Sequence, residues 1–224
     1  MDREHDLEGA GVPRLAWFGL VPAIAAGLEL AGFSWLMALS TQLGAAAAGA
    51  FQVMLSIHNI AFALSMGFGS AAGVRVGNAV GAGEREAAWS RALIAGGLAG
   101  LLLGALSLLL VLGAEQVVWP FSDDPAVLAL AASMLSVIAA FLLFDGLQYV
   151  FGAALRSLGE QVWAGVNGIL GFFLVTGGLG WWLVRAGWGP DGLAYAAGMG
   201  MLVCALLQFG RLAWVLRKSP RRSG

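Results

Sequence analysis

The sequence predicts an all-α integral membrane protein, built as a bundle of six transmembrane helices. Hydrophobic residues make up 59% of the 224 residues and charged residues only 11%, whereas charged residues approach a quarter of an ordinary soluble domain. Six apolar runs each reach the length of about 20 residues that a helix needs to cross a bilayer. Barrel strands would alternate apolar and polar residues, and these runs do not alternate, so helices are predicted.

Each predicted helix ends at a short polar or charged break. In chain order the breaks read TQLGA, RVGNAVGAGEREAAWSR, EQVVWPFSDDP, RSLGEQ and RAGWGPDG. They leave predicted spans at residues 15–39, 45–71, 91–113, 126–151, 162–184 and 192–215. The spans form one lobe, residues 14–217, between a polar tail (1–13) and a basic tail (218–224). The polar tail lacks the basic start and apolar core of a signal peptide.

Basic residues predict the orientation of the bundle. With the amino terminus in the cytoplasm, eleven of the twelve Lys and Arg residues fall inside and only Arg185 falls outside. The connection 115–125 carries Asp123 and Asp124 without a basic residue, as expected of an outer loop. We therefore expect a multi-pass protein of the cytoplasmic (inner) membrane with both termini in the cytoplasm.

Two carboxylates, Glu29 and Asp145, lie deep inside the predicted spans. An acid at the centre of a transmembrane helix costs about 2.5–3.5 kcal/mol on the insertion scale, so such residues usually mark a transport or ion site. Gln148 follows Asp145 by three residues and therefore shares its helix face. The sequence thus predicts a polar site within the bilayer.

The second span adds further polar groups. Gln52, Ser56 and Asn59 follow one another at i, i+4 and i+7, so they are predicted to line one helix face. His58 lies beside this stripe. A histidine can exchange a proton near neutral pH, so His58 is either part of a proton relay or the donor of an interhelical hydrogen bond, the more frequent role.

Three segments resemble the multidrug and toxic compound extrusion (MATE) transporters. Residues 51–84, FQVMLSIHNIAFALSMGFGSAAGVRVGNAVGAGE, resemble the second helix and the following cytoplasmic loop of the carboxy-terminal half of these proteins, and RVGNAVGAG is the most specific part. GLELAGF around Glu29 and FDGLQYVFGAALRSLGE at 144–160 resemble the seventh and tenth helices of the NorM-like branch. Glu29 and Asp145 stand where that branch holds its cation-binding acids.

The resemblance implies a cation-coupled antiporter that exports drugs or organic cations. Glu29 and Asp145 would bind either a proton or a sodium ion as the coupling ion, and no cofactor is implied. A supporting polar shell of neutral oxygens or hydrogen-bond donors would come from Gln52, Ser56, Asn59 and Gln148. The chain departs from the family at Phe51, where members usually carry His, and at Ser65, where they often carry Pro.

The resemblance covers only the carboxy-terminal six-helix lobe of a two-lobe transporter. We therefore expect a second lobe as partner, either a separate chain or a second copy, and no nucleic acid. Two alternatives stay open: a truncated remnant that no longer transports, and a lipid-precursor flippase, for which the basic residues lie too near the membrane boundaries.

An enzyme is not expected, because the spans contain no HExxH, GxSxG or phosphate-loop motif. The single Cys204 excludes a disulfide framework.

Overall fold

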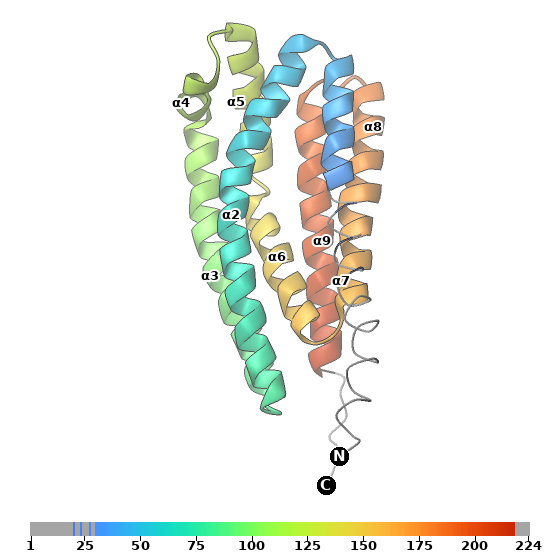
Figure 1. The fold of residues 1–224 in the computed structure, drawn as a ribbon. Helices are drawn as coiled ribbons and strands as arrows, with labels where there is room; N and C mark the ends of the chain where they lie inside the picture. Colours follow the sequence, from blue (N-terminus) through green and yellow to red (C-terminus); the bar gives the residue numbers. More distant parts are fainter. Residues whose placement is uncertain (1–19, 21–22, 24–26, 28–29, 218–224) are drawn as a thin grey trace, which may run out of the picture.

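A computed structural model describes residues 20, 23, 27 and 30–217 and shows a bundle of long helices (Figure 1). Both predicted tails, 1–13 and 218–224, lie outside the described residues. So does Glu29, together with most of residues 14–28. Residues 30–42 are helical and are called the amino-terminal helix below. The elements that follow are α2 (Ala45–Gly81), α3 (Arg85–Leu112), α4 (Ala114–Val118), η1 (Trp119–Phe121), α5 (Pro125–Ala139), α6 (Leu142–Ser157), α7 (Gln161–Gly168), η2 (Ile169–Gly177), α8 (Gly178–Arg185) and α9 (Asp191–Arg217).

The all-α membrane fold class is confirmed for the described residues. Four helices are long and apolar enough to cross a membrane, and a fifth span is added if the bent pair α5 and α6 counts as one. The segment from Gln161 to Arg185, made of α7, η2 and α8, is one of the four. The first predicted span, residues 15–39, lies only partly within the described residues.

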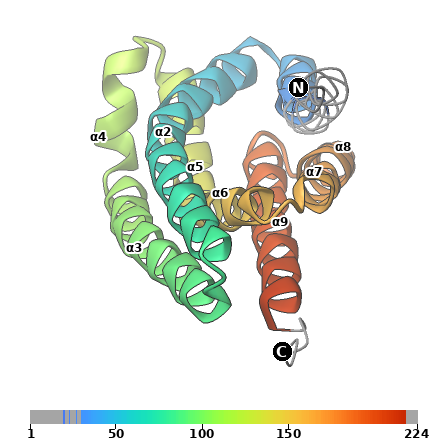
Figure 2. The ribbon, with the colours of Figure 1, turned by 60° about the horizontal axis from the view of Figure 1, so that its bottom comes forward.

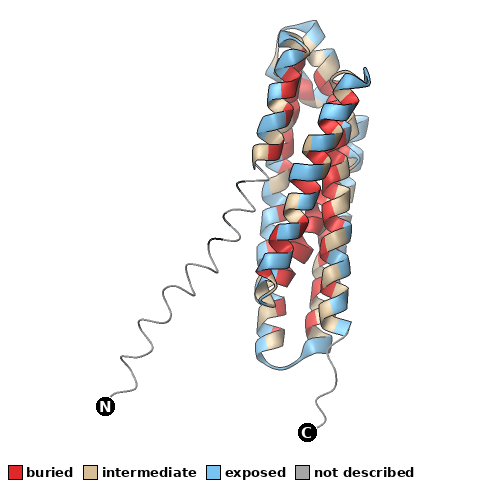
Figure 3. Cartoon of the chain, turned by 90° about the vertical axis from the view of Figure 1, so that its right-hand side faces the viewer, coloured by how far each residue is buried: buried red, intermediate tan, exposed pale blue. Residues whose placement is uncertain are grey.

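Helix α6 lies at the centre of the bundle. It packs between α2 and α3 on one side and α7 and α9 on the other (Figure 2). Buried residues line the inner helix faces, and exposed residues cover the outside (Figure 3). Much of that outside is also apolar, for example Leu101, Leu109 and Leu112 on α3. An apolar exterior is what a helix bundle surrounded by lipid requires.

Helix α2 extends ten residues beyond the predicted end of the second span at residue 71. The RVGNA segment, expected in a cytoplasmic loop, is helical as far as Gly81. Close packing against α6 accompanies the extension: a Cβ on Gly73 would meet Ala153, and a Cβ on Gly77 would lie 3.5 Å from the Cβ of Ser157 one turn further along. Small residues on one helix face let two backbones approach closely, and this contact stabilises the added turns.

The fourth predicted span, residues 126–151, is broken into two helices that meet at an angle of 48°. No proline or glycine marks the break. Its physical cause is a side chain from another helix, because the Ser107 hydroxyl of α3 donates a hydrogen bond of 2.6 Å to the Ala139 carbonyl. A side chain that occupies a helical carbonyl in this way is a recognised cause of a kink. Asp145 consequently belongs to the shorter helix α6 and not to a single straight span.

A π-helical stretch, η2, interrupts the span from Gln161 to Arg185. Within it the Thr176 hydroxyl donates a hydrogen bond of 3.2 Å to the Gly171 carbonyl, five residues earlier. The amino-terminal helix and α9 both approach this stretch closely through glycine: a Cβ on Gly32 would clash with the Phe172 carbonyl, and one on Gly200 would lie 2.7 Å from the Gly171 carbonyl oxygen. Widened π turns are frequently found at functional sites in helices.

Arg211 of α9 is clamped at the end of the bundle that we expect to be cytoplasmic. Its Nη2 and Nε donate to one carboxylate oxygen of Glu160, at 2.6 and 3.0 Å. Its guanidinium also lies 4.5 Å from the ring centroids of both Trp163 and Trp214. The clamp joins the turn between α6 and α7 to α9.

We expect Arg211→Ala to lower the free energy of unfolding by about 1.5–3 kcal/mol, the range for hydrogen bonds to charged groups. The loss follows because Glu160 would be left partly buried without its partner, and the two Trp rings would lose a cation–π contact. Thermal unfolding in detergent measures the effect. Arg85→Ala, which removes an exposed arginine, is the control. Equal unfolding temperatures for the two variants would contradict this role of the clamp.

Candidate functional site

Asp145 is a buried acid in the first turn of α6, with only 1% of its surface exposed. Its Oδ1 accepts a hydrogen bond of 3.3 Å from Gln148 Nε2. Its Oδ2 accepts one of 3.4 Å from the Ser65 hydroxyl of α2 and lies 3.7 Å from His58 Nε2. Two helices therefore supply the groups that surround this carboxylate.

His58 is buried between two aromatic rings. Phe33 of the amino-terminal helix and Phe62 of α2 stack on the imidazole with centroid distances of 5.8 and 6.2 Å. Neither ring nitrogen has a hydrogen-bond partner among the described residues, and Nε2 lies 3.7 Å from Asp145 Oδ2. The stacking holds the imidazole edge toward the carboxylate.

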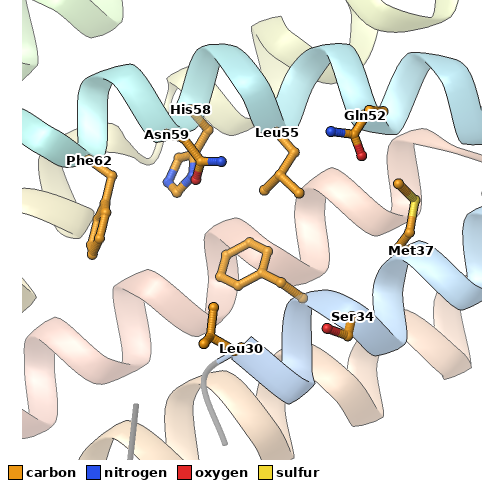
Figure 4. Close-up of a pocket in the computed structure, with 9 residues that line it drawn as sticks. Leu30, Ser34, Met37, Gln52, Leu55, His58, Asn59 and Phe62 are labelled. Carbon is orange, nitrogen blue, oxygen red and sulfur yellow. The ribbon is translucent and has the colours of Figure 1, made fainter. Parts of the chain in front are cut away.

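A pocket of about 350 Å³ opens beside this pair, between α2 and the amino-terminal helix (Figure 4). Its polar lining comes from Gln52, His58 and Asn59 of α2 and from Ser34 across the pocket. The remaining lining is apolar or aromatic and consists of Leu30, Phe33, Met37, Leu55 and Phe62. Predominantly apolar walls with a few placed polar groups are typical of a small-molecule site.

The predicted site residues fall into two groups in the structure. Asp145, Gln148 and His58 come together, whereas Gln52 and Asn59 line the pocket without a described contact to Asp145. Glu29 lies outside the described residues, so its place relative to either group is not part of the structure described.

Ser56 does not line the pocket, although the i, i+4, i+7 pattern placed it on the same stripe. Its hydroxyl donates a hydrogen bond of 2.8 Å to the Gln52 carbonyl of its own helix. At about 100° per residue, Ser56 stands roughly 40° from Gln52 on the side away from Leu55 and Phe62. Gln52, Ser56 and Asn59 therefore do lie near one face of α2, but only Gln52 and Asn59 line the pocket.

Ser65 is the site residue that the sequence patterns missed. It is fully buried and contacts Asp145, but the sequence marked it only as a position where the family often has proline. Its spacing of seven residues from His58 would have revealed it, because residues at i and i+7 share a helix face.

The chemistry available at Asp145 is that of an exchangeable acid. A carboxylate and a hydroxyl oxygen are ligands that a hard cation accepts, and the carboxylate can alternatively take a proton. Gln148 does not point its oxygen here, because its Nε2 faces Asp145, so it contributes a donor and not a ligand. No cluster of three or more His, Cys, Asp or Glu side chains that could hold a metal ion occurs within the described residues.

A family model described as MatE matches residues 23–182 of the chain. The multidrug resistance protein NorM of Burkholderia vietnamiensis is 34% identical over 178 residues, which cover 77% of this chain and 38% of that protein. A probable NorM protein of Rhodopseudomonas palustris is 32% identical over 219 residues, covering 96% of this chain and 45% of that protein. The multidrug and toxin extrusion protein 2 of Mus musculus is 33% identical, covering 81% and 30%.

Solved structures of MATE transporters share the fold of this chain. The eukaryotic MATE transporter AtDTX14 superposes with a TM-score of 0.81 at 23% identity, over 94% of this chain and 47% of that chain. An outward-facing multidrug resistance MATE family transporter of the MOP superfamily superposes with a TM-score of 0.82 at 19% identity, over 90% and 46%. The chain spans less than half the length of each of these proteins.

Proposed function

The chain belongs to the MatE family as a NorM-like member, and we propose that it forms one half of a transporter that couples the entry of sodium ions or protons to the export of organic cations. The observation that carries the proposal is Asp145, a buried acid that lies 3.7 Å from His58, which itself lines an apolar and aromatic pocket. The relatives are named multidrug resistance proteins, which supports export of drugs as the activity. The proposal assigns the chain no enzymatic reaction.

Coupling requires that the ion and the drug favour different conformations of the protein. In the proposed cycle, Asp145 binds sodium or a proton when the site faces outside, and the bound cation neutralises the buried charge. Glu29 is the second proposed acid of this step. Release of the ion inside restores a carboxylate that attracts the next organic cation.

The substrate class follows from the lining of the pocket. Phe33 and Phe62 offer aromatic faces, and such faces attract organic cations with an energy that grows when the site excludes water. Gln52 and Asn59 supply hydrogen-bond donors and acceptors to the same space. We therefore expect amphipathic organic cations, and not the phosphate groups of a lipid precursor, because no Lys or Arg is among the described residues that line this pocket.

A second lobe is proposed as the partner that completes the site. Gln52 and Asn59 are exposed on a helix that we expect to lie in the membrane, where uncovered polar groups are costly. Alternating access also needs two bundles that move against each other around a shared site. The second lobe can belong to the same polypeptide, to a separate chain or to a second copy of this lobe.

The test of function and assembly is the native mass in nanodiscs, measured together with drug accumulation in cells that lack their own efflux pumps. Particles that contain two lobes should lower the accumulation of a fluorescent organic cation. A stable single lobe that exports the drug unaided would contradict the proposed pairing. Two-lobe particles without any export would instead favour the alternative of a lobe that keeps the fold but no longer transports.

The proposed orientation places both termini in the cytoplasm, since most basic residues then lie inside. A cysteine introduced at Ser223, in a variant that carries Cys204→Ala, should react with an impermeant maleimide only after the cells are opened. A cysteine introduced at Asp123, in the proposed outer connection, should react in intact cells. Labelling at position 223 in intact cells would overturn this orientation.

A further inference from the structure

Five buried polar side chains form a continuous chain of contacts that starts at Asp145 and crosses three helices. Gln148 Nε2 lies 3.3 Å from Asp145 Oδ1, and Cys204 Sγ of α9 lies 3.7 Å from Gln148 Oε1. Gln208 Nε2, one turn along α9, lies 3.9 Å from Cys204 Sγ, and Asn167 Nδ2 of α7 lies 3.2 Å from Gln208 Oε1. Each of the five side chains is more than nine-tenths buried.

The direction of this chain is fixed at its far end by a backbone group. Gln208 Nε2 donates a hydrogen bond of 3.0 Å to the Ala164 carbonyl. A carbonyl oxygen can only accept, so the amide nitrogen of Gln208 must face Ala164 and its oxygen must face Asn167. The two hydrogen bonds to Ala164 and Asn167 therefore fix which end of the Gln208 amide carries the nitrogen.

The hydrogen bonds keep the same donor-to-acceptor direction as far as the carboxylate of Asp145. Gln208 Nε2 donates toward the sulfur of Cys204, and Cys204 Sγ in turn donates toward Gln148 Oε1. Gln148 then has its Nε2 toward Asp145. Along the chain each side chain donates to the next one nearer to Asp145, while Gln208 Nε2 also donates to the Ala164 carbonyl. Hydrogen bonds aligned in this way polarise and strengthen one another.

Close packing keeps the chain enclosed. A Cβ on Gly152 of α6 would lie 3.4 Å from Gln208 Nε2, and a Cβ on Gly171 of η2 would lie 2.7 Å from the Cβ of Cys204. Glycine at these two positions lets α6 and η2 approach α9 where the polar side chains meet.

We propose that this chain is a positioning device that commits Asp145 Oδ1 to Gln148 and presents Oδ2, beside Ser65, to the coupling cation. These contacts connect the Asn167 amide on α7 to the Asp145 carboxylate on α6. The affinity of Asp145 for sodium therefore depends on residues of other helices. Gln148, Cys204, Gln208 and Asn167 act through Asp145 and do not touch the cation. The inference rests on the proposed function only in assigning the cation to Asp145.

The first test of the chain does not involve transport. Cys204 is the single cysteine, so its S–H stretching band in the infrared spectrum belongs to this site alone. A thiol that donates a hydrogen bond absorbs at a lower frequency than a thiol that does not. The wild-type band should lie low and should move toward the frequency of a non-donating thiol in Gln148→Met. Gln116→Met, which removes an exposed amide of α4, is the matched control and should leave the band in place.

The second test measures sodium binding by sodium NMR relaxation, with the protein in nanodiscs. Cys204→Ala and Gln208→Met should raise the half-saturating sodium concentration about tenfold, which corresponds to about 1.4 kcal/mol. Cys204→Ser keeps a donor and an acceptor and should restore most of the affinity, which a purely structural role of the sulfur would not explain. Gln116→Met should bind sodium like the wild type.

An unshifted S–H band in Gln148→Met, or wild-type sodium affinity in Cys204→Ala, would overturn the positioning role. A wild-type protein that binds no sodium would overturn the presentation of Oδ2 to this cation. Sodium binding that responds to the variants as expected, in a protein that exports no organic cation, would support the chain and contradict only the proposed function.

Discussion

Asp145→Asn is expected to reduce cation-driven drug efflux to the background of empty vesicles, while the protein stays folded in the membrane. The change removes the group that exchanges a proton or binds sodium but preserves the size of the side chain. It also removes a buried charge that costs about 2.5–3.5 kcal/mol at the centre of a membrane helix, so stability should hold or rise. Efflux from proteoliposomes and thermal unfolding of the same preparation measure the two effects. Glu29→Gln should abolish coupled efflux as well.

Asp123→Asn is the matched control, because it makes the same chemical change at an exposed position between η1 and α5. This control should transport like the wild type. Full sodium-driven and proton-driven efflux in both Asp145→Asn and Glu29→Gln would show that these acids do not couple the ion. Loss of folded protein in Asp145→Asn would show instead that the carboxylate serves the packing of α2 against α6.

Gly200→Ala is expected to destabilise the bundle by about 3 kcal/mol, at the upper end of the usual effect of overpacking. The added Cβ would lie 2.7 Å from the Gly171 carbonyl oxygen and would clash with the Thr176 hydroxyl. Thr176 can change its rotamer, but the backbone of η2 cannot yield without moving the whole π-helical stretch. A fall in the unfolding temperature of roughly 6–12 °C is expected for a chain of this size.

Gly210→Ala provides the comparison on the same helix. No atom lies within 4 Å of a Cβ built at Gly210, so the added methyl meets open space. Alanine also favours a helix over glycine by about 1 kcal/mol, so Gly210→Ala should unfold at the same or a higher temperature than the wild type. If both variants lost the same stability, close packing of α9 against η2 would not be the cause.

The sequence predicts the helices well and their interruptions poorly. The apolar runs at 162–184 and 192–215 agree with the observed helices within two residues at each end, since length and hydropathy suffice for a membrane span. The break at Ala139 was missed because its cause, the Ser107 hydroxyl, lies on another helix. Local patterns contain no information about such a contact.

The candidate site was predictable to a similar degree. Burial of an acid in an apolar run singled out Asp145, and helical spacing joined Gln148 to it. The part contributed by Gln208 and Asn167 was not predictable, because the two residues are 41 positions apart and meet only when α7 packs against α9. Polar residues scattered singly over several spans give no pattern until the fold brings them together.

The most direct test of cation-coupled export is transport in proteoliposomes under an imposed ion gradient. The preparation should contain the active two-lobe assembly, a fluorescent organic cation inside the vesicles, and either a sodium or a proton gradient across the membrane. We expect drug to leave the vesicles when the ion gradient is directed inward, and to enter them when the gradient is reversed. Drug movement that follows its own concentration gradient and does not respond to either ion would contradict the account.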